Sequence, residues 1–375
     1  MSGDQDLVAQ TVRDILEQHE PFALTAERPW DADLWRVLAE SGLTGVGISE
    51  EAGGSGGEFA DAVAVVRTLA EGAAAVPVAE QLLVAGPAVE MAGLPLPSPE
   101  EPLTFALPSG PGAGAPGTSV SASTAVSASG SEGSWTLSGT AAEVPWAAVA
   151  STIAVVAQAP DGPVLALVPT ADVPVQHSSN LAGEPRGRVR LDGVRPAAAA
   201  GLTPAQVDEL RARYALARAV QLSAALEQIL AWTVQYAGER QQFGRPLGKF
   251  QAIQMELAQM AGEVTAVAAL VDAAVQAAAG EGRGVLLGAA AAKVRAGAAV
   301  EVVAKLAHQV HGAIGFTQEH RLHHLTRRCW AWRDEAGSEL AWSRVLGAGL
   351  VGPASTAGGG PALADGLWPA LTAVF

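Results

Sequence analysis

Residues 236–254 read YAGERQQFGRPLGKFQAIQ and join two segments whose apolar residues recur at helical spacing. Leu222 and Leu226 belong to the pattern before the stretch, and Leu257 and Val264 belong to the pattern after it. A connection between two bundle helices normally needs only a glycine and a cap. The surplus of arginine and aromatic residues therefore points either to a ligand contact or to a solvated turn.

Three side chains of this stretch suit a nucleotide. The guanidinium groups of Arg240 and Arg245 match the oxygens of a phosphate or pyrophosphate, and the ring of Phe243 can stack on a purine. The alternative is a solvated turn, because paired arginines are common on protein surfaces, where their charges contribute little to stability. Spacing alone leaves both interpretations open.

The helical patterns extend over residues 200–352. Thr203, Pro204 and Gln206 are typical of a helix start, because threonine caps, proline fits the first turn and glutamine at the third position reaches back. A further helix is predicted from residue 285 to His311, ending at Gly312. Long helices that each carry one apolar stripe predict an antiparallel bundle.

Two regions that differ in composition and in the spacing of their apolar residues precede the predicted bundle. Residues 1–100 place apolar residues at helical spacing around a glycine-rich loop, which predicts a helical domain. Residues 101–199 predict a small, mostly antiparallel β-domain, because short β-rich pieces alternate with Pro, Gly and Ser. The predicted strands cover residues 103–107, 134–137, 151–156, 164–168 and 188–191. Residues 109–129 are of low complexity and predict a loop in part, and residues 353–375 form a tail.

Composition excludes several classes of function. A formal net charge of -15 argues against nucleic acid, which requires clustered Lys and Arg. The single cysteine, Cys329, rules out an intrachain disulfide and a cysteine zinc site. The first ten residues contain Asp4 and Asp6 and no apolar core, so no signal peptide is expected. No membrane span is expected either, and the chain is predicted to be cytoplasmic.

Two further clusters, one of histidines and one of glycines, could form ligand sites but are better explained as ordinary structural features. Five of the seven histidines lie between His308 and His324, which raises a metal site, but their spacing with few carboxylates favours a polar face between subunits, and no metal is expected. Residues 53–57 are glycine-rich, yet they lack the lysine and the preceding strand of a P-loop, which favours a turn. A nucleophilic hydrolase is not supported, since no Gly-x-Ser-x-Gly elbow is present.

The order of these segments resembles the acyl-CoA dehydrogenase family. Residues 236–254 are similar to its signature Tyr-x-x-x-Arg-x-x-Phe-Gly followed by Phe/His-Gln-x-x-Gln. Residues 308–317 read HQVHGAIGFT and are similar to its segment Gln-x-x-Gly-Gly-x-Gly-Phe/Tyr-Thr. Residues 42–54 read GLTGVGISEEAGG and are similar to its N-terminal loop. The likeness spans nearly the whole chain.

The resemblance implies an α+β, mostly α fold: a helical N-terminal domain, a small central antiparallel β-domain and a C-terminal four-helix bundle. It implies an acyl-CoA substrate, catabolism of fatty acids or steroids, and FAD held between subunits of a homo-oligomer or of a mixed tetramer with a homologous subunit. By motif match, the residues that contact the adenine and pyrophosphate half or the ribityl track of a neighbour's FAD are Arg240, Phe243, Gln251, Gln309, Gly312 and Ala313.

The sequence departs from the family where the chemistry takes place. In the family a glutamate removes the substrate α-proton, and the count from His311 places Ala336 there, with Glu335 adjacent. Some relatives place the glutamate early in the first bundle helix, where this chain has Tyr214. The flavin-contact segments of the β-domain correspond to residues 108–115 and 142–146, and both are degraded. The catalytic base of this chain is therefore unassigned.

Three hypotheses follow. The first is an active flavoenzyme that oxidises an acyl-CoA thioester to the α,β-unsaturated product, with Glu335 or an unaligned residue as base. The second, which the retained C-terminal motifs favour, is a subunit that completes the FAD site of a catalytic homologue, or is a catalytically silent structural subunit. The third is a flavin enzyme of different chemistry on the same scaffold, because a fold does not fix a function.

Overall fold

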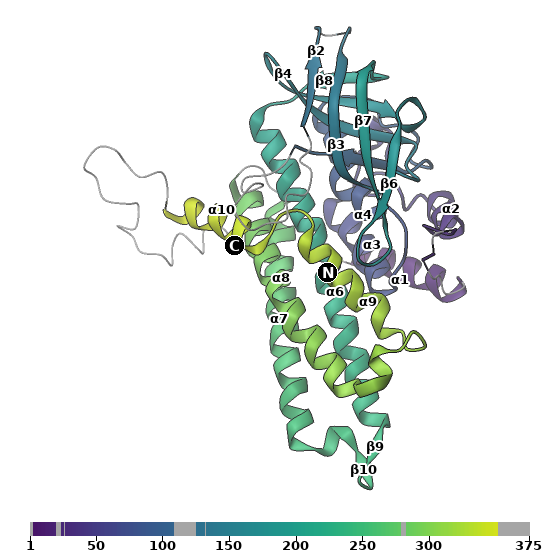
Figure 1. Ribbon diagram of the computed structural model, residues 1–375, viewed down its shortest axis with the longest axis vertical. Coiled ribbons are helices and arrows are strands. Elements are labelled where there is room, and N and C mark those ends of the chain that lie inside the picture. The colour runs from purple at the N-terminus through teal and green to yellow at the C-terminus, as the bar shows by residue number, and fades with distance from the viewer. Residues whose placement is uncertain are drawn as a thin grey trace, which may run out of the picture. The chain divides into compact units, whose positions relative to one another are not determined.

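The protein is represented by a computed structural model that describes residues 3–19, 24–25, 27–108, 125–131, 133–278 and 283–351 (Figure 1). Its contacts divide the chain into two compact units, Met1–Ala217 and Arg218–Phe375. The boundary falls within one long helix, α6 (Pro204–Glu239). The division into three domains that the sequence predicts stays a prediction.

The first unit begins with short helices and continues into a sheet. Its helical elements are α1 (Gly3–Gln18), α2 (Ala32–Glu40), η1 (Glu50–Ala52), α3 (Phe59–Glu71), α4 (Val78–Glu80), η2 (Gln81–Ala85) and α5 (Gly86–Met91). Asp31 caps α2 by accepting a hydrogen bond from Leu34 N at 3.1 Å, and Leu34, Trp35 and Leu38 are buried together as their spacing predicts. Helix α3 ends at Glu71, because Gly72 caps it and Ala73 is left-handed at φ 53°.

The glycine-rich loop before α3 is closed on itself. Gly47 N donates to Gly56 O at 2.8 Å, Gly56 N donates to Ile48 O at 2.9 Å, and Ser55 N donates to Gly45 O at 2.8 Å. Gly47 adopts φ 78°, and a Cβ there would lie 2.7 Å from Ala62 Cβ. Amides that already have backbone acceptors cannot cradle a phosphate, which agrees with the turn that the sequence favours.

A buried glutamine ties the N-terminal helices to the first strand. Gln81 begins η2, a single π-helical turn, and is 1% exposed. Its Nε2 donates to Thr44 O at 2.7 Å and to Pro99 O at 3.1 Å, and its Oε1 accepts from Leu103 N at 2.7 Å. One side chain thus satisfies three backbone groups in three separate segments.

The middle of the chain forms one mixed, eight-stranded sheet of order β6-β7-β3-β2-β4-β5-β8, with β1 beside β4. The strands are β1 (Leu103–Ala106), β2 (Ala125–Ser129), β3 (Thr136–Pro145), β4 (Thr152–Ala159), β5 (Gly162–Pro169), β6 (Val175–Ser179), β7 (Pro185–Val194) and β8 (Ala198–Gly201), with η3 (Thr170–Asp172) after β5. Five pairings are antiparallel, and β1 and β2 each pair with β4 in parallel. The expected small, mostly antiparallel β-domain is confirmed.

Continuous apolar runs explain why β4 and β5 lie in the middle of the core. Residues 153–157 and 164–168 are buried without alternation, as in strands covered on both faces. All five predicted strands are present, whereas β2, β6 and β8 were missed. Strand β2 covers 125–129 within the segment that predicts a loop in part, and residues 109–124 lie outside the described residues.

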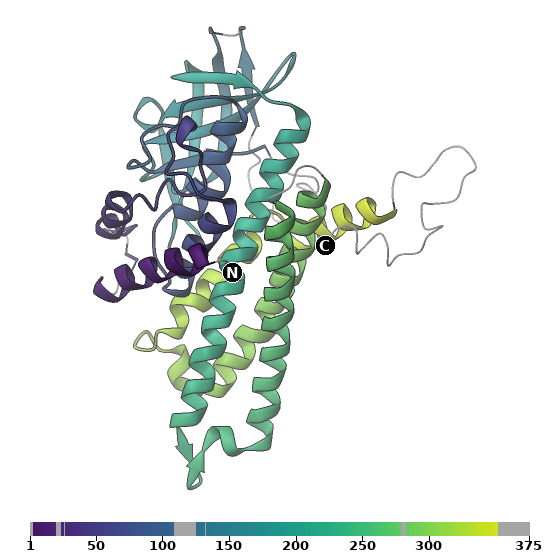
Figure 2. The ribbon, with the colours of Figure 1, turned by 180° about the vertical axis from the view of Figure 1, so that it is seen from behind.

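The second unit is a helical bundle. Its elements are the C-terminal part of α6, the hairpin β9 (Gln241–Gln242) and β10 (Arg245–Pro246), η4 (Leu247–Lys249), α7 (Gln251–Ala278), α8 (Arg283–His311), η5 (Gly312–Phe316), α9 (Leu322–Asp334) and α10 (Glu339–Val351). Figures 1 and 2 show α7 and α8 running side by side in opposite directions. The helix predicted from residue 285 to His311 is thus found.

The start of α6 forms the predicted capping box, within the first unit. Gln206 N donates to Thr203 Oγ1 at 3.2 Å, and Gln206 Oε1 accepts from Thr203 N at 2.7 Å. Both orphan donors are therefore satisfied, with Pro204 in the first turn.

Helix α7 is long and apolar enough to cross a membrane by length and composition alone. Core helices of soluble proteins pass the same test, and α7 packs along α8 with Met260, Val264 and Val267 buried. This observation is weak evidence for a membrane span.

We expect Gln81→Met to destabilise the protein by about 2–4 kcal/mol, because the change leaves three buried backbone groups without their partner. Chemical denaturation followed by circular dichroism measures the change. Gln176→Met, at an exposed position on β6 of the same unit, is the matched control and should cost under about 0.5 kcal/mol. Equal effects of the two changes would contradict the role of Gln81.

Candidate functional site

The hairpin that follows α6 presents a strained aromatic residue. Phe243 and Gly244 are the two central residues between β9 and β10, with φ of 52° and 79°, as a two-residue hairpin turn requires. Phenylalanine in the left-handed region costs of order 1–3 kcal/mol. Phe243 is also 93% exposed. Strain and exposure of a large aromatic ring at one position indicate a functional constraint.

An aromatic platform lies at the base of this turn. The Arg245 guanidinium lies 4.2 Å from the centre of the Phe250 ring, and the Phe243 ring meets Phe250 edge-on at 6.3 Å. Leu247 N donates to Arg240 O at 2.8 Å, which closes the hairpin. The side chain of Arg240 is exposed. The hairpin therefore carries two arginines and an aromatic ring at the surface.

The C-terminal end of α8 carries the second motif. Gln309 is exposed in the last turn, and Gly312 and Ala313 are exposed in η5, with Gly312 at φ 63°. Gly315 is buried, and a Cβ there would lie 2.9 Å from His311 Cβ, so the turn requires glycine. The backbone of this turn is open to a ligand or a partner.

Tyr236 brings the two motifs together. Its ring stacks on His311 with centroids 4.5 Å apart, and its hydroxyl donates to His311 O at 3.4 Å. The end of α6, the start of α7 and the end of α8 therefore meet at one end of the second unit. These helix ends, together with the hairpin β9–β10 and with η5, carry all six residues assigned by motif. Each of the six is exposed: Arg240, Phe243, Gln251, Gln309, Gly312 and Ala313.

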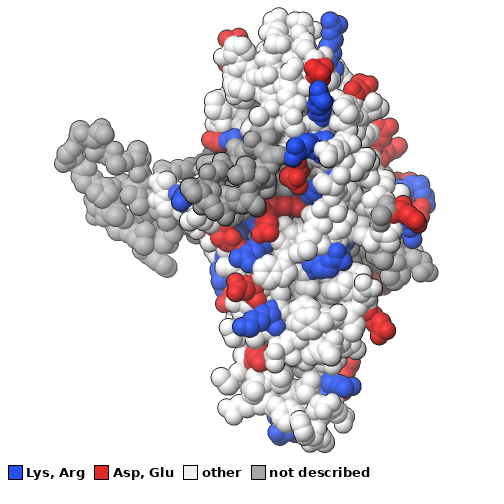
Figure 3. Space-filling model, viewed as in Figure 1, with Lys and Arg blue, Asp and Glu red and all other residues white. Residues whose placement is uncertain are grey.

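The same end exposes apolar as well as basic groups. Phe316 is 75% exposed and Ile314 is 41% exposed, beside the exposed Arg240, Arg245 and Lys249. On the visible face, the extremity that carries β9 and β10 shows blue groups and no red ones (Figure 3). Exposed aromatic rings beside basic groups are typical of a surface that binds an anionic ligand or a partner.

The position where a base is expected lies in the corner between α9 and α10. Ala336 is left-handed at φ 59°, and Gly337 follows at φ 97°. Trp342 Nε1 donates to Ala336 O at 2.6 Å, and a Cβ on Gly337 would lie 2.7 Å from that nitrogen. The methyl side chain of Ala336 cannot accept a proton.

Glu335 is held in an ion pair. Its Oε2 accepts from Arg218 Nε at 2.8 Å and lies 2.8 Å from Arg218 Nη2. The side chain of Arg218 is 1% exposed, and its Nη1 also donates to Gln221 Oε1 at 2.6 Å. Separating such a carboxylate from a buried guanidinium is costly, because it leaves a buried charge without its partner. The Glu335 carboxylate is thus engaged in an ion pair, and its assignment as base in the first hypothesis stays a prediction.

A buried lysine supports the same corner from α8. Lys293 is fully buried, and its Nζ donates to Arg333 O at 2.6 Å and to Gly337 O at 3.1 Å. Burial lowers the pKa of Lys293 from 10.5 to about 8, opposed by the negative charges of Glu339 and Glu335. The lysine thus satisfies carbonyl groups on both sides of Ala336.

Sequence reasoning missed Arg218 and Lys293. The available signal was a lone lysine on the apolar stripe formed by Ala289, Ala296 and Val300, because a charge at a core position must have partners. Their acceptors lie far along the chain, so the pairing itself leaves no local pattern.

The alternative position for a base is also blocked. In the first unit, the Tyr214 ring packs edge-on against Phe105 at 4.7 Å, and Glu209 accepts from Arg213 Nε at 2.9 Å. Tyr214 has no carboxylate, and the carboxylate of Glu209 is paired with Arg213.

The second degraded flavin segment lies on a bulge of β3. The pairing of β3 with β7 shifts between Ala141 and Val144, and Glu143 adopts φ 53° with an exposed side chain. Trp146 is left-handed at φ 56° and 3% exposed, so its indole is packed inside. This segment thus exposes an acidic side chain and buries its indole. The first segment lies almost wholly outside the described residues.

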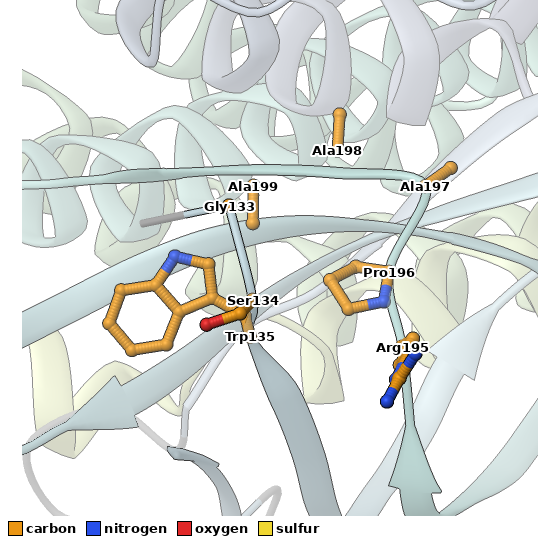
Figure 4. Close-up of a pocket in the computed structure, with 8 residues that line it drawn as sticks. All are labelled: Gly133, Ser134, Trp135, Arg195, Pro196, Ala197, Ala198 and Ala199. Carbon is orange, nitrogen blue, oxygen red and sulfur yellow. The ribbon is translucent and has the colours of Figure 1, made fainter. Parts of the chain in front are cut away.

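The first unit has a surface hollow of about 280 Å³ between the turn before β3 and the segment before β8. Ser134, Trp135 and Arg195 contribute its polar atoms (Figure 4). None of the residues assigned from the sequence lines this hollow.

Comparison with known proteins identifies the family. Residues 2–94 match the family model for the acyl-CoA dehydrogenase N-terminal domain, and residues 205–340 match the model for the acyl-CoA dehydrogenase C-terminal domain. The chain belongs to the acyl-CoA dehydrogenase family. Acyl-CoA dehydrogenases are oxidoreductases that use FAD, and the resemblance read from the sequence is thereby confirmed.

Similar proteins include subunits of complexes. Acyl-CoA dehydrogenase IpdE2 from Mycobacterium tuberculosis is 28% identical over 85% of this chain and 89% of its own length. A chain of the ChsE4–ChsE5 complex from the same organism is 26% identical with a TM-score of 0.82, covering 92% of this chain and 97% of that one. A chain of the Tcur3481–Tcur3483 steroid acyl-CoA dehydrogenase variant is 30% identical with a TM-score of 0.78, covering 92% and 96%.

The residues of this acyl-CoA dehydrogenase chain fit one half of FAD. Exposed arginines, a projecting aromatic ring and an open glycine turn suit an adenine and a pyrophosphate. The bulge at Glu143 and Trp146 does not suit the flavin ring. Among the described residues, the groups of the two motifs therefore suit the nucleotide part of FAD better than the described β3 segment suits its ring.

We expect Arg218→Met to destabilise the protein by about 3–5 kcal/mol, because it leaves the Glu335 carboxylate without its buried partner. Glu335→Leu should cost a similar amount, and the double variant should cost much less than the sum. Chemical denaturation of all four proteins provides the double-mutant cycle. Additive losses would contradict a structural role for Glu335.

We expect the stability of the wild type to rise with pH relative to Lys293→Met. Between pH 8 and pH 10.5 the unfolded chain holds a proton on Lys293 that the folded chain has released. The unfolded state binds more protons there, so the free energy of unfolding increases by about 1.4 kcal/mol per pH unit. Urea denaturation at pH 7.5 and pH 9.5 measures the difference, and a constant gap between the two proteins would contradict it.

Proposed function

We propose that this chain is a subunit of an acyl-CoA dehydrogenase assembly that completes the FAD site of a homologous partner. It supplies Arg240, Phe243 and Gln251 from the hairpin side and Gln309, Gly312 and Ala313 from the α8 side. The partner supplies the base and the contacts to the flavin ring. The assembly oxidises an acyl-CoA thioester, with a steroid-derived or fatty acyl group, in the cytoplasm.

One observation carries this proposal. The six residues assigned to the nucleotide half are all exposed and gather at one end of the second unit, while the corner that holds the family's base is occupied by Ala336. Groups that serve a neighbour must reach the surface, whereas a base that serves its own chain must sit at a shielded site with its substrate. This chain retains the exposed groups that serve a neighbour and has lost the base that would serve its own substrate.

The charges around the corner support the same division of roles. Glu335 is neutralised by Arg218, and Arg333 Nε donates to Glu339 Oε1 at 2.5 Å. The acids of this corner thus stabilise the fold. The ChsE4–ChsE5 complex is a heteromer of two named chains, which supports assembly with a homologous subunit as the mode of action.

Two alternatives remain as outcomes of the test. A catalytically silent structural subunit would assemble with a partner without touching its FAD. A flavin enzyme of different chemistry would bind FAD by itself. The strained, exposed Phe243 argues against the silent subunit, because strain of this kind persists where it serves a purpose.

The test is co-expression with a homologous acyl-CoA dehydrogenase chain from the same organism that carries the base and the flavin-contact segments. We expect this chain alone to purify without flavin, and the complex to be yellow and bleached anaerobically by acyl-CoA. In the complex, Arg240→Gln should lower FAD occupancy about tenfold at limiting FAD, as loss of one charge-assisted contact to phosphate predicts.

The matched control is Arg36→Gln, an exposed arginine on α2, which should leave FAD occupancy unchanged. An isolated chain that binds flavin and is bleached by acyl-CoA would refute the proposal and support an active homo-oligomer. An FAD occupancy of the complex that stays unchanged by Arg240→Gln would indicate a catalytically silent structural subunit.

A further inference from the structure

Three histidines meet at the end of the bundle that carries the motif residues. His311 is 3% exposed, and its ring lies 4.7 Å from that of His320 and 4.5 Å from that of Tyr236. One turn earlier on α8, His308 stacks on Phe316 of η5 at 4.5 Å. We call His308, His311 and His320 the histidine cluster. Within the described ranges, no group of three or more His, Cys, Asp or Glu is arranged to hold a metal ion.

The hydrogen bonds of the cluster require neutral rings. His311 Nδ1 lies 2.8 Å from Ala307 O, so this nitrogen carries the proton and donates it. His311 Nε2 is buried and meets no hydrogen-bond partner among the described residues. A proton on that nitrogen would form a buried N–H⁺ without an acceptor, which is costly.

His320 has the opposite arrangement and leads to the same requirement. Its Nδ1 accepts from Leu322 N at 3.2 Å, at the first residue of α9. A proton on Nδ1 would place two donors against each other and remove an acceptor from the start of the helix. Protonation of His320 therefore weakens the connection between η5 and α9.

Among the described residues, the charged groups that act on the cluster bring positive charge, and no carboxylate is hydrogen-bonded to its rings. Arg321 lies over the Trp232 ring at 4.3 Å and donates to Gln235 Oε1 at 3.4 Å, and its charge lowers the pKa of His320. His323 also lowers it. From α6 the cluster meets Tyr236, and from η5 it meets Phe316. The adjacent acids Glu239 and Glu319 are exposed, and Glu239 accepts from Gln235.

Burial acts on all three rings in the same direction. It is the main cause that lowers the pKa of His308, of His311 and of His320 below the ordinary value of 6.5. A backbone hydrogen bond at Gly315 opposes it in part for His308, and one at Ala307 does so for His311. The three rings are therefore neutral at pH 7.5. They take up protons only as the pH falls below 6.5, the ordinary pKa of histidine.

We propose that the histidine cluster makes the docking of this bundle end to a partner subunit dependent on pH, with docking favoured when the cluster is neutral. The inference rests on the proposed function, since it concerns the regulation of the same surface. Gln309, Gly312 and Ala313 follow directly on His308 and His311, so a change in the rings reaches the docking residues without a long-range mechanism.

Two physical effects act together. Protonated rings about 5 Å apart repel each other and Arg321, which separates η5 from α8 and disturbs the exposed Phe316. Docking also removes more water from the rings, so a protonated cluster must release its protons before it binds. Both effects weaken docking as the pH falls.

The experiment uses the co-purified complex with the homologous flavoprotein chain. The dissociation constant is measured by sedimentation or native mass spectrometry at pH 7.5 and pH 5.5 at constant ionic strength. We expect the dissociation constant to rise about threefold to fivefold for each histidine whose pKa falls by one unit on docking, since the full factor of about ten is reached only well below both pKa values.

The decisive variant carries His308→Gln, His311→Gln and His320→Gln, because glutamine keeps hydrogen-bonding capacity and does not titrate in this range. It should bind equally at both pH values. His177→Gln on β6, at an exposed position, is the matched control and should keep the wild-type pH dependence. His320→Gln alone should reduce that dependence if the triple variant fails to fold.

The outcomes separate this inference from the proposed function. Absence of a complex at pH 7.5 refutes the proposed function and with it this inference. A complex whose dissociation constant is the same at both pH values refutes the inference alone. For the isolated chain, hydrogen exchange of residues 308–317, corrected for intrinsic rates, should show loss of protection at pH 5.5, and equal protection at both pH values would overturn the inference.

Discussion

The second unit depends on two buried cations that hold the corner after α9. Lys293 donates to carbonyl groups on both sides of Ala336, and Arg218 holds Glu335. A buried charge is costly unless it is paired, so these contacts restrict the corner to one arrangement. The backbone of Ala336 is left-handed in consequence, and Trp342 fixes its carbonyl group. Two acids of the corner, Glu335 and Glu339, are held in ion pairs with Arg218 and Arg333.

The end of the second unit that carries β9, β10 and η5 differs from this corner, because its side chains are exposed. Phe243 and Phe316 project into solvent, and the arginines beside them are exposed. A soluble chain tolerates such a surface when a partner or ligand covers it. One unit thus combines a corner that has Ala336 at the expected position of the base with an exposed end that carries the motif residues. The proposed role of a contributing subunit requires these two properties together.

Local patterns predicted much of the fold and the membership of the family. The capping box at Thr203, the strands around 151–168 and the helix ending at His311 depend on neighbouring residues, and each was found. Strands β2, β6 and β8 were missed, because short or polar segments become strands only through pairing with partners distant in sequence. The assignments of Arg240, Phe243 and Gln309 to a nucleotide remain predictions.

The sequence by itself determined the helix and strand periodicity, the absence of a glutamate at position 336 and the motif residues, because these are properties of residue type and spacing. Only the tertiary structure decided that Glu335 is bound to Arg218, that Lys293 holds the corner, and that the two motifs share one end through Tyr236 and His311. Such pairings join residues 40 or more positions apart. Their energy depends on burial and distance, which the linear order of residues does not record.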